Sequence, residues 1–362
     1  MHPAQIGVQP NNIVEKSKIN NYKAELQSAQ DAFNRLNRDN DSGKIPQREL
    51  DLINELKGKI ALLENMLNAR SNNDWKGELS AQISLDKQLL ADIKSGNAVS
   101  GENVNDIENR ISINEILLEK NIKPMIVENS MTAYNFVRLA MQQMFPVLSI
   151  IITLLLSADF VSAESDEGTF KFLLIQPISR SKILFSKIIA SALICILTMA
   201  MIMFGFFSAL GLILGFGSPV YPTQFYTGSF SFLFHSGFGI KLIGMKEIIL
   251  MGLPLNILFV IFIASFGILM STVFQNSATS ISVSIMLASA ANIFDSQLKL
   301  FKSISSLLPF TYGDAIDVLN GNMIGQFGNK NITFLTGIVV LVIFTIAFYS
   351  ISCFIFKRKD IR

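Results

Sequence analysis

Apolar residues gather in five long stretches in the second part of the chain, and each stretch is close to the length of a membrane-crossing helix. A helix needs roughly 20 mostly apolar residues to cross the hydrocarbon core of a bilayer. The stretches occupy residues 139–161, 188–214, 248–272, 277–294 and 333–356. Ser and Thr dilute the fourth stretch, although small residues favour close packing of helices in lipid. The pattern predicts five membrane spans.

Residues 1–130 follow a different pattern, in which single apolar residues recur at alternating steps of three and four. This spacing predicts long helices with narrow apolar seams, paired as hairpins or coiled coils. Turn-forming residues interrupt the pattern at 39–46, 71–74 and 95–103. The seams comprise Tyr22, Leu26, Ala29, Phe33 and Leu36, then Ile53, Leu56, Ile60, Leu63 and Leu67, then Ile107, Ile111 and Leu118. The module is either a helical spacer or a domain that binds a ligand or partner.

The chain is therefore expected to be all-α: a polytopic transmembrane helix bundle at 131–362, preceded by a helical module at 1–130. Charge follows the same division, since residues 1–130 carry 16 Lys/Arg and 19 Asp/Glu, and the remainder carries only 14 and 9. The net charge of +2 gives no reason to expect binding to nucleic acid. The two cysteines, Cys195 and Cys353, both lie in apolar stretches and indicate no disulfide framework.

The sidedness of the spans is inferred from Lys and Arg. If the C-terminal KRKDIR is cytoplasmic, the segment between the first two spans is cytoplasmic too, and residues 1–130 lie outside. Inner and outer segments near the membrane then hold eight Lys/Arg each, but the inner eight are concentrated in two short segments, where the positive-inside rule is strongest. No apolar segment precedes the polar module to carry it across. We therefore expect a span ahead of residue 1, and six spans in all.

A calcium-loop look-alike occurs in the polar module, around Asp39, Asp41 and Glu49. A calcium-binding loop needs alternating oxygen ligands, a glycine at its sixth position and a bidentate Glu at its twelfth. If Gly43 takes the sixth position, the first ligand position falls on Arg38, a cation; if Asn37 is the first ligand, Gly43 and Glu49 each lie one place late. The segment is interpreted as a polar turn between helices, and no metal site is predicted elsewhere.

Two stretches near the outer ends of the spans invite interpretation. The loop at about 215–246 interleaves Phe and Tyr with Gly and Ser, which is typical of an aromatic belt at the membrane interface, with a substrate exit surface as the alternative. The apolar segment 300–311 is flanked by Asp295, Asp314 and Asp317 and could enter the outer leaflet as a re-entrant element. Such backbone is tolerated only where it is buried in protein or faces water.

The most specific segment of the chain, VSAESDEGTFKFLLIQPISRSKILFSK, lies between the first two spans. It predicts a short amphipathic helix at about 162–180, because Phe170, Leu173 and Leu174 share one helical face. Glu164 lies near the amino end of this helix, where the helix dipole favours negative charge, and Pro177 ends it. An in-plane interfacial helix of no special function would have the same pattern.

This segment resembles the permease subunits of the type-2 ATP-binding-cassette (ABC) exporter family. In order, it carries the family's glutamate, Gly-Thr pair, Leu-Leu pair, proline, serine and arginine, here Glu164, Gly168, Thr169, Leu173, Leu174, Pro177, Ser179 and Arg180. The resemblance covers about 139–362 and includes VFQNSA (273–278) and LLPFTYGDAIDVL (307–319). It implies that the helix at 162–180 couples the spans to a cytoplasmic ATPase. The family has six spans, and some members insert a helical extracytoplasmic region after the first one, which would match 1–130.

The resemblance also implies the partners. The chain has no phosphate-binding loop of the glycine-lysine-serine/threonine type, so ATP and Mg²⁺ would be held by a separate ATPase subunit and none bound directly by this chain. A second permease copy or a paralogue would complete the pathway in the plasma membrane. The expected function is export of an unidentified substrate by a subunit that is not itself an enzyme. The alternatives are an ATPase-driven mechanical transmitter that regulates an envelope partner, and a membrane receptor, which the lack of a long cytoplasmic segment disfavours.

Overall fold

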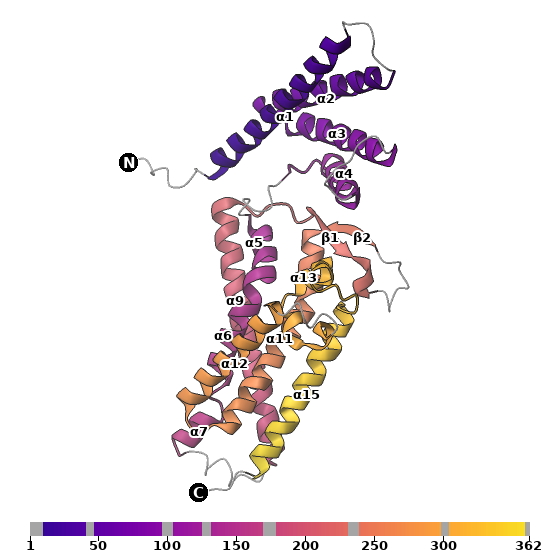
Figure 1. Ribbon diagram of the computed structural model, residues 1–362. Coiled ribbons are helices and arrows are strands. Elements are labelled where there is room, and N and C mark those ends of the chain that lie inside the picture. The colour runs from indigo at the N-terminus through magenta and orange to yellow at the C-terminus, as the bar shows by residue number, and fades with distance from the viewer. Residues whose placement is uncertain are drawn as a thin grey trace, which may run out of the picture. The chain divides into compact units, whose positions relative to one another are not determined.

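The computed structural model describes residues 10–40, 47–95, 104–124, 132–168, 179–230, 239–297 and 304–358. The chain divides into two compact units, Met1–Ser130 and Met131–Arg362. The division falls where the polar module gives way to the apolar stretches. Figure 1 draws both units, and each is described here by itself.

The first unit consists of four helices in its described part, each packed on the next along the chain. Their bounds are α1 Pro10–Asn40, α2 Gln47–Ser71, α3 Trp75–Ser95 and α4 Val104–Glu119. The turn between α2 and α3 is tight, with Asn73 at a φ of 55° and the Asp74 carboxylate accepting from the Gly77 N–H at 3.1 Å. An aspartate in this position caps the amino end of the helix that follows.

Apolar seams of these helices meet in two small clusters. Ala29, Leu63, Met66 and Ala81 form one, and Ile83, Ile107 and Ile111 form the other. Ion pairs border them: Arg70 Nη1 lies 2.9 Å from Glu78 Oε2, and Arg110 holds the buried Asp86 through two bonds of 2.8 and 2.9 Å. Paired charges of this kind allow a narrow helical unit to enclose polar groups without leaving them unsatisfied.

The second unit contains the apolar helices, and four of its described segments are long and apolar enough to cross a membrane. They are Ala133–Asp166, Ser181–Leu214, Met245–Val273 and Phe334–Arg358. The last three correspond to α9 (Arg180–Leu214), α11 (Met245–Val273) and α15 (Phe334–Arg358). Large apolar side chains on their outer faces, such as Leu197, Met201 and Phe204 of α9, are more than half exposed. The chain is therefore a polytopic, mainly helical membrane protein.

The fourth predicted span, 277–294, is helix α12 (Ser277–Gln297). Its apolar part, Ser277–Ile293, is shorter than the four long spans. Five serines and one threonine dilute it, as the sequence indicated. Ser280 and Ser284 turn into the protein, where both are buried.

The first span begins six residues earlier than the apolar stretch predicts. Helix α5 (Ala133–Leu139) continues through a π-helical turn, η1 (Ala140–Met144), into α6 (Phe145–Ser157). The π turn lies just ahead of Pro146, whose ring nitrogen cannot donate a helical bond. The early start includes Arg138, which is buried because its guanidinium donates to Asn135 Oδ1 and Gln142 Oε1. Because the charge of Arg138 is hydrogen-bonded within its own helix, the helix continues through it. The hydropathy pattern treats Arg138 as a polar boundary and therefore places the start of the first span too late.

Helix α11 lies at the centre of the second unit and packs on α6, α9, α12 and α15. Its inner face supplies Leu255, Phe259, Phe262 and Ile263, all at most 1% exposed, to the main core. Around it the long helices run roughly side by side (Figure 1).

A short antiparallel pair of strands departs from the predicted all-α class. Strand β1 (Pro222–Tyr226) pairs with β2 (Ile240–Gly244), with Phe225 opposite Lys241. Phe225 is buried in the main core, and Ser229, in the turn η2 (Thr227–Phe230) after β1, donates to the Val318 carbonyl at 3.1 Å. The interpretation of this loop as an aromatic belt is therefore wrong for Phe225, which packs inward. The glycines and serines between its aromatic residues hid the strand period.

The segment predicted as re-entrant folds into short turns in its described part. It contains η4 (Ser305–Leu307) and the start of η5 (Pro309–Gly313), and the short helices α13 (Ala315–Asn320) and α14 (Asn322–Phe327) follow it. Thr311 and Tyr312 are buried, and their hydroxyls donate to the carbonyls of Ser305 and Ser306 at 2.9 and 2.7 Å. The irregular backbone is thus satisfied by its own side chains, as burial in protein requires.

Asp317 links this segment to the first span. Its Oδ1 accepts from the side-chain amides of Gln142 (2.7 Å), Asn320 (3.1 Å) and Asn322 (2.8 Å). Gln142 in turn accepts from Arg138, so a chain of hydrogen bonds joins α5 to α13.

Candidate functional site

The turn that follows the first span is bonded to the carboxyl-terminal end of α11. This turn leads into α7 (Ser162–Asp166), whose first backbone N–H groups have no partner within the helix. Ser271 Oγ accepts from the N–H groups of Val161 (2.9 Å) and Ser162 (2.8 Å), and it donates to Ser162 Oγ (3.2 Å). One buried serine of α11 therefore caps α7 from outside.

An ion pair joins the same turn to α9. Glu164 Oε1 lies 2.6 Å from Lys187 Nζ, and Lys187 also donates to the Phe160 carbonyl. The side chain of Lys187 is only 12% exposed and that of Glu164 is 28% exposed. Lys187 belongs to the short segment whose Lys and Arg residues are expected at the cytoplasmic lipid face, and for Lys187 this expectation is wrong, because its ammonium is turned toward the protein.

Helix α12 holds the turn from a third side. Ser280 donates to the Ala158 carbonyl at 2.5 Å, and the Asn276 amide donates to Asp166 Oδ2 at 3.3 Å. Asn276 also accepts from the Thr279 N–H at 3.1 Å, so it caps the start of α12 while it contacts α7.

An apolar cluster beneath these polar contacts adds the end of α15. Val161, Leu184, Ile188, Ile268 and Phe356 are all buried together. Tyr349 of α15 donates to the Ser181 carbonyl at 3.3 Å. The turn at 158–168, called here the coupling turn, thus contacts or adjoins the ends of four helices at one end of the second unit (Figure 1).

The structure describes part of the predicted coupling segment. Glu164 lies within α7 and forms the ion pair, and Gly168 follows α7 with a φ of 71°, a left-handed conformation that glycine adopts without strain. Ser179 precedes α9, and Arg180 is its first residue. Thr169, Leu173, Leu174 and Pro177 lie outside the described residues, so the amphipathic helix predicted there stays a prediction.

The calcium-loop look-alike also lies largely outside this part of the structure, since Asp41 and the side chains of Asp39 and Glu49 are not described. Among the residues that are described, no three His, Cys, Asp or Glu side chains gather to hold a metal ion.

Three residues of the coupling turn's surroundings were missed as site residues by sequence reasoning: Lys187, Ser271 and Asn276. Only Asn276 had a signal, because it lies in VFQNSA, the short connection that the family resemblance covers. Ser271 and Lys187 lie within apolar helices, and their partners Ser162 and Glu164 are more than twenty residues away in the sequence. The spacing of residues along one helix does not indicate contacts between residues so far apart.

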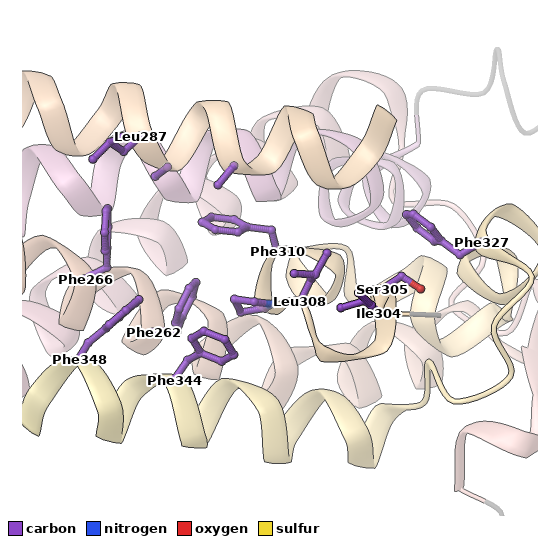
Figure 2. A pocket seen from close by; sticks show the side chains of 13 residues that line it. Phe262, Phe266, Leu287, Ile304, Ser305, Leu308, Phe310, Phe327, Phe344 and Phe348 are labelled. Atoms are coloured by element: carbon purple, nitrogen blue, oxygen red, sulfur yellow. The ribbon is translucent and has the colours of Figure 1, made fainter. Parts of the chain in front are cut away.

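A second feature is a cavity of about 570 Å³ between α11, α12, α15 and the turns η4 and η5. Figure 2 shows side chains from these elements gathered around it. Ser305 supplies the polar side chain of the lining, which otherwise consists of apolar residues, six of them phenylalanines: Phe262, Phe266, Phe310, Phe327, Phe344 and Phe348.

The phenylalanines of this cavity, called here the phenylalanine cavity, support one another. The rings of Phe262 and Phe348 stack with centroids 5.7 Å apart, and Phe310 meets Phe262 edge to face at 5.6 Å. Aromatic pairs in these arrangements are favourable beyond the area they bury. Ligand pockets typically enclose about 300–1,000 Å³ and are lined mainly by apolar and aromatic side chains. The cavity has the size and lining of a binding site for an apolar group.

The chain is similar to a protein family and to two proteins of Bacillus subtilis. The family model described as a protein of unknown function (DUF2705) matches residues 118–362. The uncharacterized membrane protein YdbK of Bacillus subtilis (strain 168) is 30% identical over 224 residues, which are 60% of this chain and 80% of YdbK. The uncharacterized protein YhcI of the same organism is 26% identical over 304 residues, 83% of this chain and 90% of YhcI. No solved structure matches the chain.

Proposed function

We propose that this chain, which belongs to the DUF2705 family, is the membrane-spanning permease subunit of an ATP-driven exporter of the type-2 ABC class. The observation that carries the proposal is the coupling turn. The segment that resembles the exporter family begins at Glu164, and Glu164 lies in a turn held by the ends of α9, α11 and α12 and adjoining the end of α15. A force applied to this turn would reach four helices at once.

Rigid attachment is what a coupling element requires. Coupling between distant parts of a protein is carried by packed side chains and hydrogen bonds that move together. Ser271, Lys187 and Ser280 bind the coupling turn from three helices, so the turn cannot move without them. Asp166, Glu167 and Gly168 are exposed at its far end and are free of the core, and these residues would face the ATPase.

The positions of basic residues support a cytoplasmic location for this end. Lys182 and Lys187 near the start of α9 and Lys357 and Arg358 at the end of α15 lie at the same end of the second unit, because Leu184 and Phe356 share one apolar cluster. Concentrated Lys and Arg favour the cytoplasmic side. In this topology the C-terminus is cytoplasmic, residues 1–130 are extracytoplasmic, and the protein lies in the plasma membrane.

The number of spans is part of the proposal. Helix α12 has 21 residues and is therefore about 31 Å long, close to the roughly 30 Å of the hydrocarbon core. Counting α12 gives five spans. Two such permease subunits, identical or paralogous, would form the pathway above two ATPase subunits that bind ATP and Mg²⁺.

Co-purification tests the contact with an ATPase. The chain would be co-expressed with each candidate ABC ATPase of its own organism. Glu167→Arg is expected to lower the ATPase recovered with it, because the charge reversal falls on the exposed end of the coupling turn. Lys330→Glu is the matched control, since Lys330 is also exposed but precedes α15, whose 25 residues place it about 37 Å from the coupling end. Equal recovery with Glu167→Arg and wild type would contradict the proposal.

The first unit favours one alternative, a mechanical transmitter that regulates an envelope partner without transport. Four helices that pack into a compact unit of their own could relay motion to such a partner. Reconstitution in proteoliposomes with the ATPase separates the two functions: the exporter moves a substrate when ATP is hydrolysed, whereas the transmitter hydrolyses ATP without movement of any substrate.

A further inference from the structure

A polar pocket of about 210 Å³ lies beside the phenylalanine cavity. Both are lined by Phe310 and Phe327, so the two pockets adjoin at these rings. The polar side chains that line the second pocket come from the first span, α12, η5 with the residue that follows it, and α14: Gln142, Gln143, Asn292, Thr311, Asp314 and Gln326.

We propose that the phenylalanine cavity and the polar pocket together bind one amphiphilic molecule, with its apolar chain in the cavity and a hydrogen-bonding head without negative charge in the pocket. The binding is an inference from the two pockets, and its interpretation as the exported substrate rests on the proposed function.

The apolar chain is indicated by the lining of the larger cavity. Six phenylalanines and the aliphatic residues between them offer no hydrogen bond, and Ser305 Oγ already accepts from the Asn329 amide at 3.3 Å. A polar group placed there would lose its hydrogen bonds to water without replacement, which disfavours its binding. An alkyl or aromatic group loses nothing and fills space that water would leave dry.

The head is indicated by the charges of the smaller pocket. None of the described residues that line it is Lys, Arg or His, so an anionic head would meet no counter-charge. Gln143, Asn292 and Gln326 offer both amide donors and carbonyl acceptors, whereas Gln142 is already bonded to Arg138 and Asp317. Asp314 is partly buried, and this burial, together with neighbouring Asp317, raises the pKa of its carboxyl to about 9. The protonated carboxyl of Asp314 can both donate and accept a hydrogen bond, and its ionised form would pair with a cationic head.

Helix α12 places the boundary between the two environments. Leu287, Ala288 and Ala291 face the phenylalanine cavity, whereas Asn292, the next residue, lines the polar pocket. The change from apolar to polar within one helical step matches the join between the chain and the head of an amphiphile.

Photolabelling of the purified full chain in phosphatidylcholine nanodiscs tests the proposal. The probes are hexadecanol, hexadecylamine and palmitic acid, each with a diazirine near the end of the alkyl chain, and the labelled residues are read by mass spectrometry. Hexadecanol and hexadecylamine are expected to label residues of the phenylalanine cavity, and palmitate at pH 8 is expected to label them at least about tenfold less, a difference of ~1.4 kcal/mol. Equal labelling by all three probes would overturn the assignment of the head.

A filled cavity provides the second arm. Ala291→Phe adds a ring inside the phenylalanine cavity and is expected to abolish labelling there, whereas Ala290→Phe, one residue earlier on the exposed face of α12, is expected to preserve it. Unchanged labelling in Ala291→Phe would mean that the probes reach these residues from bulk lipid only, and the proposal would fail.

Gln326→Lys tests the head by a gain of binding. Gln326 is exposed on the wall of the polar pocket, so a lysine there is tolerated by the fold. It is expected to raise labelling by palmitate and to lower labelling by hexadecylamine, and no change in either would overturn the assignment of the head. None of these measurements needs the ATPase. Absence of probe binding would therefore overturn the amphiphile site alone, and absence of ATPase association would overturn the proposed function alone.

Discussion

Lys187 brings a positive charge into the packed end of α9, and its surroundings explain how the chain tolerates it. The ammonium pairs with Glu164 at 2.6 Å and also donates to the Phe160 carbonyl. Ion pairs on open surfaces are worth about 0–1 kcal/mol, but this lysine is only 12% exposed and has lost most of its water. The pair therefore stabilises the attachment of the coupling turn to α9 as long as both partners are present.

Lys187→Met is expected to destabilise the protein by about 1–3 kcal/mol, nearer the lower value because Glu164 retains contact with water. Lys182→Met is the control: Lys182 is exposed one turn earlier on α9, and its loss should change stability by no more than about 0.5 kcal/mol. Thermal unfolding in detergent compares the two variants. Equal shifts would show that the buried ion pair has no special role.

Asp314 predicts a dependence of stability on pH. An aspartate in an unfolded chain has a pKa near 3.9, whereas burial and Asp317 raise the pKa of Asp314 to about 9. The folded state holds this proton more tightly than the unfolded state does. The proton's contribution to the free energy of unfolding is therefore fully present below about pH 4 and is lost as pH rises toward 9.

Asp314→Asn should flatten this dependence. Asparagine still caps α13 through its side-chain oxygen, as Asp314 does for the Asp317 N–H at 3.1 Å. The melting temperature of the wild type is expected to fall more between about pH 5 and about pH 8 than that of the variant. The same slope in both proteins would assign the pH dependence to other groups.

At the scale of elements, α15 approaches the centre of the second unit closely at Gly337. A methyl group at this position would lie 2.5 Å from Tyr312 Cδ1 and 3.0 Å from Leu255 Cδ1. Tyr312 is fully buried and fixed by its bond to the Ser306 carbonyl, so it cannot move aside at low cost.

Gly337→Ala is therefore expected to destabilise the protein by about 1–3 kcal/mol through overpacking. Gly205→Ala on α9 is the matched control, because no atom lies within 4 Å of the added methyl group. The better helix propensity of alanine should make the control neutral or stabilising by up to about 1 kcal/mol. Thermal unfolding of both variants measures the difference, and a stabilised Gly337→Ala would refute the close contact.

The elements themselves were largely predictable, whereas the contacts between them were not. Long runs of apolar residues mark α9, α11 and α15 because lipid accepts little else, and the runs need no knowledge of neighbours. The start of the first span was missed because Arg138 is satisfied by Asn135 and Gln142. The exporter-like motif identified Glu164 as a site residue, but nothing in the sequence identified its partner Lys187. Contacts between different helices follow no regular spacing along the chain. The six phenylalanines of the cavity come from four elements, α11, η5, α14 and α15, and were missed for the same reason.

At the scale of the whole molecule, the account assigns opposite ends of the second unit to opposite sides of the membrane. Glu167 is exposed at the end that we place in the cytoplasm, and Lys330 is exposed before α15, at the other end. Both can carry a cysteine for labelling, since Cys195 is buried and Cys353 is half-buried.

In intact cells, a membrane-impermeant maleimide should label Lys330→Cys, whereas Glu167→Cys should be labelled only after the membrane is permeabilised. Because both positions are exposed, a difference between them reports sidedness rather than burial. Labelling of Glu167→Cys in intact cells would reverse the topology and would remove the coupling turn from reach of a cytoplasmic ATPase.

Site-specific crosslinking in native membranes tests the central claim most directly. A photoreactive amino acid would replace Glu167, at the exposed end of the coupling turn, and in a separate variant Lys330, and the crosslinked proteins would be identified by mass spectrometry. The account predicts that position 167 crosslinks to an ABC ATPase and that position 330 does not. An ATPase crosslinked from neither position, or from position 330 alone, would contradict it.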